Sequence, residues 1–143
     1  MKRVDVVYCL ITDPAQSKIL MVRNKDNGRW SLPGGAVEEN ETLQTAAIRE
    51  AKEETGLDVE VFGIVAVNEG VLKKRNEHNL FFTFRAKVIG GREEIVRPDE
   101  ITDMVWVDIE QAEILMPMPF YKEGLSIIVR ENMEVSYFND GIV

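Results

Sequence analysis

Several residue types on which common functional sites depend are scarce in this chain. It contains one cysteine, Cys9, and one histidine, His78, among its 143 residues. A single cysteine excludes an internal disulfide framework. Together with the lone histidine, it also argues against a Ser-His-Asp triad or a cysteine nucleophile. We expect Cys9, in the middle of a strand, to be a small core residue, and His78 to be exposed in a polar loop.

Long apolar segments are also missing. No apolar run approaches the roughly 18 residues that a membrane-spanning helix needs. The first 13 residues carry a charge at Asp5 and no small-residue cleavage site, so they indicate a first strand rather than a signal peptide. We therefore expect a cytoplasmic protein that does not interact with a membrane.

Positive charge is in short supply, because 17 lysines and arginines face 25 aspartates and glutamates, for a net charge of −8. Such an acidic protein does not hold nucleic acid by general phosphate neutralisation. The acidic residues are concentrated between positions 38 and 60. They are Glu38, Glu39, Glu41, Glu50, Glu53, Glu54, Asp58 and Glu60. A concentration of this kind is either a solvated surface or a site for hard cations, and the spacing has to decide.

The remaining composition is that of a globular domain. Hydrophobic residues make up 45% of the chain, which is enough for a core, and there is no repeat, low-complexity tract or linker. Residues 1–143 are therefore predicted to form a single domain. The patterns predict strands at 4–11, 18–23, 59–67, 80–88, 104–107 and 134–138, helices at 42–55, 108–115 and 121–131, and a loop at 30–35. This order favours the α/β (α+β) class, with a mixed sheet flanked by helices.

The predicted helix at 42–55 breaks the usual pattern of an amphipathic helix. Its apolar stripe is formed by Leu43, Ala47 and Ala51, and it should face the core. Glutamates 50, 53 and 54 are spaced i, i+3 and i+4, so their side chains cluster. Two of them, Glu50 and Glu54, fall beside the stripe that should be buried. The stripe is therefore apolar at its start and acidic in its last turns.

Stability alone does not favour this arrangement. Like charges at i,i+4 cost roughly 0.2–0.5 kcal/mol, and acids near a helix C-terminus oppose its dipole by roughly 0.3–1 kcal/mol each. Arg49 can pair with Glu53, but one arginine cannot offset three carboxylates. A divalent cation can, because carboxylate oxygens are the ligands that Mg²⁺ prefers. Gly34 and Gly35 would let the backbone approach such an ion closely. The alternative is a solvated acidic face.

The residues of this region resemble the signature of the Nudix (MutT-like) hydrolases. Gly35 is followed by Glu41 and then by the run Arg49-Glu50-Ala51-Lys52-Glu53-Glu54-Thr55-Gly56-Leu57. Every fixed position of the 23-residue signature is filled, and Ala51 alone is smaller than the usual aliphatic residue. The signature covers about a sixth of the chain. The resemblance implies a Nudix-type α/β/α sandwich, with a mixed β-sheet and the motif as loop-helix-loop.

The resemblance also implies a reaction and a set of site residues. Members hydrolyse nucleoside diphosphate-linked compounds with Mg²⁺ or Mn²⁺. Carried onto this sequence, the metal ligands are Glu50, Glu53, Glu54 and the carbonyl of Gly34 or Gly35. Arg49 and Glu41 orient these ligands. The catalytic set is Glu50, Glu53, Arg49 and Glu100. The general base is left open between a motif glutamate and Glu100, with Glu93, Glu94 and Asp99 as rivals in the same loop.

The substrate is constrained mainly by what is missing. The proline of ADP-ribose hydrolases is absent, because Gly70-Val71-Leu72-Lys73 stands in its place, and the tyrosine of diadenosine polyphosphate hydrolases is absent too. The marks of NADH and coenzyme A hydrolases are also missing. We favour a (deoxy)nucleoside triphosphate, oxidised nucleotides included, cut to monophosphate and pyrophosphate. An RNA 5′ pyrophosphohydrolase is the nearest rival, supported by the basic run at 73–75.

Two readings from other classes are retained. One is a non-catalytic Nudix domain that senses a nucleotide, although such domains generally lose motif glutamates and this chain keeps them. The other is an acidic cation-binding domain, which would need neither Gly35 nor Arg49. The expected partner is a nucleotide or another nucleoside diphosphate-linked small molecule, with an RNA 5′ end as the rival. The protein is expected to be a monomer or a homodimer.

Overall fold

The computed structural model describes residues 1–116 and 124–143. Met118, with the prolines beside it, and the first three residues of the predicted helix at 121–131 lie outside the described residues. Within the described part, no helix is long and apolar enough to cross a bilayer.

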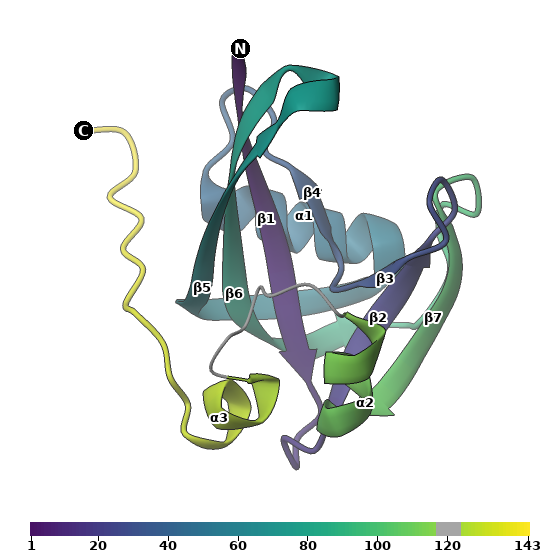
Figure 1. Ribbon diagram of the computed structural model, residues 1–143. Coiled ribbons are helices and arrows are strands. Elements are labelled where there is room, and N and C mark those ends of the chain that lie inside the picture. Colours follow the sequence, from purple (N-terminus) through teal and green to yellow (C-terminus); the bar gives the residue numbers. More distant parts are fainter. Residues whose placement is uncertain (117–123) are drawn as a thin grey trace.

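A mixed sheet forms the centre of the molecule, as the sequence predicted (Figure 1). Its strands are β1 (Lys2–Thr12), β2 (Lys18–Asn24), β3 (Trp30–Ser31), β4 (Gly34–Ala36), β5 (Leu57–Leu72), β6 (Glu77–Gly91) and β7 (Ile101–Asp108). The order along the main path is β3-β2-β1-β6-β5, while β4 pairs with β1 and β7 pairs with β2. The β1–β6 pair is parallel and the other pairs are antiparallel. Strand β1 therefore joins the motif loop to the long β5–β6 hairpin.

Helices cover both faces of this sheet. Figure 1 shows α1 (Leu43–Thr55) behind the sheet and the two short helices α2 (Ile109–Leu115) and α3 (Leu125–Arg130) in front. All three predicted helices are present in the described residues. The C-terminal segment then runs back along the edge of the sheet beside β5 and β6.

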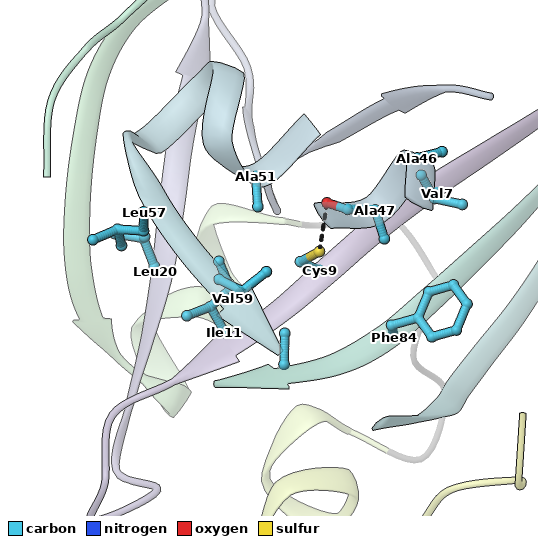
Figure 2. Packing of buried hydrophobic residues seen from close by; sticks show 11 residues of the cluster. Val7, Cys9, Ile11, Leu20, Ala46, Ala47, Ala51, Leu57, Val59 and Phe84 are labelled. Carbon is cyan, nitrogen blue, oxygen red and sulfur yellow. Dashed lines mark hydrogen bonds between the residues drawn. The ribbon is translucent and has the colours of Figure 1, made fainter. Parts of the chain in front are cut away.

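Side chains of β1 alternate between two buried cores. Val7, Cys9 and Ile11 face the core beneath α1, while Tyr8 and Leu10 face the core beneath α2 and α3. A strand buried on both faces needs an almost continuous apolar run, which is what the sequence provides. Figure 2 shows the α1-side core, where the Cys9 thiol donates to the Ala47 carbonyl at 3.3 Å. The expectation that Cys9 is a core residue is therefore confirmed.

Two predicted elements are wrong. Residues 134–138 do not form a strand, because Val135 makes only an isolated bridge to Ile64. Glu134 instead accepts a hydrogen bond from the backbone of Gly63 and pairs with Arg85 at 2.7 Å. The segment at 30–35 is not wholly a loop either, since it contributes β3 and the start of β4. The strands also extend beyond their predicted bounds, because ladder hydrogen bonds continue into polar residues that carry no strand pattern.

Candidate active site

Helix α1 has well-defined ends. The Thr42 hydroxyl accepts a hydrogen bond from the Thr45 amide at 3.1 Å, which caps the first turn. Gly56 ends the helix in the left-handed conformation with φ 77°, and a Cβ there would collide with the Arg92 carbonyl. Both caps were predicted from the sequence. Between these ends, Ala47 and Ala51 are buried against the sheet.

The motif loop approaches α1 through its two glycines. The Gly34 amide donates to Oε1 of Glu54 at 2.9 Å. A Cβ on Gly35 would lie 2.5 Å from Oε1 of Glu50, so a larger residue cannot stand there without displacing that carboxylate. Pairing of β4 with residues 6–8 of β1 holds this loop in place. The glycines and the glutamates that the sequence grouped together are thus adjacent in space.

Glu54 is a buried carboxylate, with only 6% of its surface exposed. Its pKa is raised to about 8, mainly by burial; the charges of Glu50 and Glu100 contribute to the rise, and the hydrogen bond from Gly34 opposes it. The pKa of the neighbouring Cys9 thiol is raised to about 12, mainly by burial and further by the charge of Glu54. Burial likewise raises the pKa of Glu50, although Arg49 opposes it.

Arg49 binds a carboxylate before α1 and two carboxylates within α1. Its Nε and Nη2 donate to the two oxygens of Glu41 at 2.7 and 2.8 Å, and Nη2 also reaches the Ala36 carbonyl. Its Nη1 lies 3.0 Å from Glu50 and 3.1 Å from Glu53. The predicted pair with Glu53 is present, and the fork to Glu41 is one that lysine cannot reproduce. These contacts lower the pKa of Glu41 and raise that of the guanidinium.

Glu100 lies in the turn that precedes β7, with its side chain half exposed. The negative charge of Glu100 helps to raise the pKa of both Glu50 and Glu54, so Glu100 interacts electrostatically with the carboxylates of α1. Its rival Glu93 accepts a hydrogen bond from the Trp106 indole at 2.8 Å. Glu100 is therefore the loop acid with the clearest relation to the α1 carboxylates.

Arg97 is a site residue that the sequence analysis missed. Its Nη2 lies 3.0 Å from Oε1 of Glu53, and its Nη1 lies 3.7 Å from Glu100. No local pattern connects position 97 with position 53, so the contact could be found only in the folded chain.

Among residues 1–116 and 124–143, no three His, Cys, Asp or Glu side chains converge as a ready-made metal cage. The α1 carboxylates are held instead by arginines and by the Gly34 amide.

The histidine, the basic run and the two tryptophans have other surroundings. His78 lies in β6 rather than in the expected loop, where it is partly exposed and contacts Glu69 at 2.7 Å. The basic run forms an exposed turn of 3₁₀ helix, Lys73–Arg75, between β5 and β6. Trp30 and Trp106 are half-buried and pack against the two cores.

The family of the chain follows from comparison with known proteins. The sequence model of the NUDIX domain matches residues 2–127. The chain belongs to the Nudix family. Its Nudix signature is the loop and helix described above, from Gly35 to Leu57.

Three curated relatives are similar over much of the chain. A MutT-like protein of Streptomyces ambofaciens is 37% identical over 95 residues, which cover 60% of this chain and 59% of that protein. An ADP-ribose pyrophosphatase of Methanocaldococcus jannaschii is 35% identical over 96 residues, covering 65% and 56%. A proposed 8-oxo-dGTP diphosphatase of Bacillus subtilis is 32% identical over 109 residues, covering 76% and 69%. The chain thus spans less than two thirds of the length of the first two relatives.

Solved Nudix structures share the fold. A NUDIX hydrolase from Nitrosomonas europaea matches 99% of this chain and all of that chain with a TM-score of 0.77 at 20% identity. A MutT NUDIX hydrolase from Burkholderia pseudomallei matches 93% of this chain and all of that chain with a TM-score of 0.72 at 23% identity. The expected α/β/α sandwich with a mixed sheet is therefore confirmed.

Proposed function

We propose that this Nudix protein hydrolyses a diphosphate linkage in a nucleotide, with Mg²⁺ or Mn²⁺ as cofactor. The observation that carries the proposal is Glu54, a buried carboxylate beside two other glutamates and a backbone that only glycine permits. Burying a carboxylate among like charges is costly unless a cation or a proton compensates for it. A divalent ion would supply that compensation.

The donor set fits a hard divalent cation. The ligands would be oxygens of Glu50, Glu53 and Glu54, joined by the carbonyl of Gly34 or Gly35, and oxygen ligands are what Mg²⁺ selects. The close approach of the Gly35 backbone to Glu50 supports this fit, because a Cβ would occupy the space between them. Bound there, the ion would neutralise phosphate charge and lower the pKa of a coordinated water.

The protein side chains would orient the reactants and move the proton. Arg49 would hold Glu50 and Glu53 toward the metal, since it contacts both and is anchored by Glu41. Either a glutamate of α1 or Glu100 would accept the proton of the attacking water. Of the loop acids, Glu100 is favoured over Glu93, because Glu93 is engaged by Trp106.

The substrate that we favour is a (deoxy)nucleoside triphosphate, oxidised nucleotides included. The missing subfamily marks and the similarity to the Bacillus subtilis protein named for 8-oxo-dGTP support this choice. The similarity to an ADP-ribose pyrophosphatase speaks for another substrate, so ADP-ribose must be included in the assay. Products should be identified as well as rates, because monophosphate and pyrophosphate would show that the bond between the α- and β-phosphates is cut.

An RNA 5′ triphosphate is the second candidate, and the exposed basic turn Lys73–Arg75 between β5 and β6 favours it. Triphosphorylated RNA belongs in the same panel. Replacing Lys73 and Lys74 with glutamine should reduce its hydrolysis, while leaving that of free nucleotides unchanged.

The decisive variant is Glu54→Gln, which removes the charge and keeps the shape. We expect Mg²⁺-dependent phosphate release to fall by at least about a hundredfold while nucleotide still binds. The matched control is Glu39→Gln, an exposed acid just before the helix, which should leave turnover unchanged. Unchanged turnover in Glu54→Gln would contradict the site assignment and favour a nucleotide-sensing domain or a plain acidic one.

A further inference from the structure

Glu53 is held between two guanidinium groups that come from different parts of the chain. Arg49, one turn earlier in α1, contacts its Oε2 at 3.1 Å, and Arg97 contacts its Oε1 at 3.0 Å. Each carboxylate oxygen has two lone-pair sites. Both oxygens therefore keep a further site for another partner while the carboxylate plane is fixed from two sides.

The turn that supplies Arg97 also supplies Glu100. The Arg97 carbonyl accepts hydrogen bonds from the amides of Glu100 at 3.0 Å and Ile101 at 2.9 Å. Ile101 is buried at the start of β7, and the Glu100 carbonyl accepts from the Lys25 amide at 2.9 Å. The backbone of the turn is thus anchored to the sheet, while the Arg97 side chain links it to α1.

A positive group is needed at this junction. Glu100 repels the glutamates of α1, as its contribution to the raised pKa of Glu50 and Glu54 indicates. The Arg97 guanidinium faces carboxylates on both elements, with Nη2 on Glu53 and Nη1 3.7 Å from Glu100. Pro98 restricts the backbone of the residue before it, which lowers the entropy lost when Arg97 is held in one geometry.

We propose that Arg97 is a positioning residue of the active site, which docks the turn bearing Glu100 onto α1 and holds Glu53 opposite Arg49. The inference rests on the proposed function, because it assigns Glu100 a part in the reaction. Arg97 itself acts through these two carboxylates. Losing the link should let the turn move away from the helix, and displacements of about 1 Å can cost roughly a hundredfold in rate.

The kinetic test compares Arg97→Gln with Arg92→Gln, an exposed arginine of the same loop. We expect Arg97→Gln to lower kcat by about 10- to 100-fold with little change in KM, and Arg92→Gln to leave both unchanged. Arg97→Lys keeps the charge but loses the fork, so it should lie between wild type and Arg97→Gln. In a protein that already carries Glu100→Gln, adding Arg97→Gln should lower kcat by no more than about a further twofold, because both residues act on one function.

A second readout does not depend on turnover. Mn²⁺ bound to ¹⁵N-labelled protein broadens nearby amide resonances, and those of Asp99 and Glu100 should be broadened strongly in wild type. In Arg97→Gln this broadening should fall at least twofold, while the amides of Gly34 and Gly35 stay as broad as before.

Several results would overturn the inference. If Arg97→Gln behaves like Arg92→Gln in both the kinetics and the Mn²⁺ broadening, the inference is wrong and the proposed function remains intact. Arg97 does not act through Glu100 if the kcat losses of Arg97→Gln and Glu100→Gln multiply in the double variant. The same conclusion follows if Glu100→Gln keeps full activity. If wild type binds no Mn²⁺, or Glu54→Gln retains full hydrolysis, the proposed function fails and this inference fails with it.

Discussion

Glu41, just before α1, and Glu54, in its last turn, are two carboxylates of one motif in opposite surroundings. Arg49 binds Glu41 with a fork of two hydrogen bonds, which lowers the pKa of that carboxyl. Glu54 receives a single backbone hydrogen bond and is buried among acids, and burial raises its pKa to about 8. The start of the helix is therefore built as a stable folded element. Its end holds Glu54, which pairs with no lysine or arginine of the described residues, as expected of a site completed by a cation.

The largest effect is expected from changing Arg49, which links Glu41 at the start of the helix to Glu50 and Glu53 near its end. Arg49→Lys keeps the charge but cannot bind both oxygens of Glu41 while reaching Glu50 and Glu53. We expect kcat to fall by about a hundredfold and the free energy of unfolding to fall by about 2 kcal/mol. Denaturant titration and Mg²⁺-dependent turnover would measure the two effects. An Arg49→Lys protein with wild-type stability would mean that the fork to Glu41 is not a stabilising contact.

A smaller effect of opposite sign is expected at the acidic end. In metal-free protein, Glu54→Gln should raise the free energy of unfolding at pH 8 by about 1–2 kcal/mol, because it removes a buried charge. The folded pKa of about 8 lies above the ordinary value of 4.5. The contribution of Glu54 to stability is therefore complete below pH 4.5 and is lost as the pH rises through 8. Denaturant titrations across this range should show a shallower decline in the variant than in wild type, and parallel curves would contradict the burial argument.

The smallest expected effect is at Glu41, where the sign of the pH dependence reverses. Glu41→Gln should lower the free energy of unfolding at pH 7 by about 1 kcal/mol, because a charge-assisted fork becomes a neutral contact. The folded pKa of Glu41 is depressed, so its stabilisation is present above its ordinary pKa and is lost as the pH falls through the folded value. Wild type and variant should converge in acid. A constant difference at all pH values would point to lost packing rather than a lost charge.

Local interactions explain which parts of the motif helix could be predicted. The Thr42 cap, the Gly56 end and the Arg49–Glu53 pair all join residues within four positions of one another. The wheel placed Glu54 beside the buried stripe, and it is buried in the structure. By contrast, the Arg97–Glu53 contact joins positions 44 residues apart, and nothing in the sequence around either residue indicates it.

The C-terminal segment shows the same limit. The pattern at 134–138 predicted a strand, but a bulged part of β5 meets it at Ile64 and Gly63. There a Cβ on Gly63 would collide with the Glu134 carboxylate. The Tyr137 hydroxyl accepts a long hydrogen bond from the Gln44 amide at 3.4 Å, near the start of α1. Side-chain contacts to residues 71 and 93 positions earlier therefore replace the strand ladder.

The sequence by itself determined the caps of α1, its alanine stripe, the spacing of its glutamates and the glycines before it. These features depend on helical periodicity and on backbone conformations that few residues adopt. Only the tertiary structure decided how deeply Glu54 is buried, and that Arg97 reaches both Glu53 and Glu100. Burial and long-range electrostatics depend on which distant segments pack together, and that is settled when β1 pairs with β4 and β6 and the turn before β7 is anchored to the sheet.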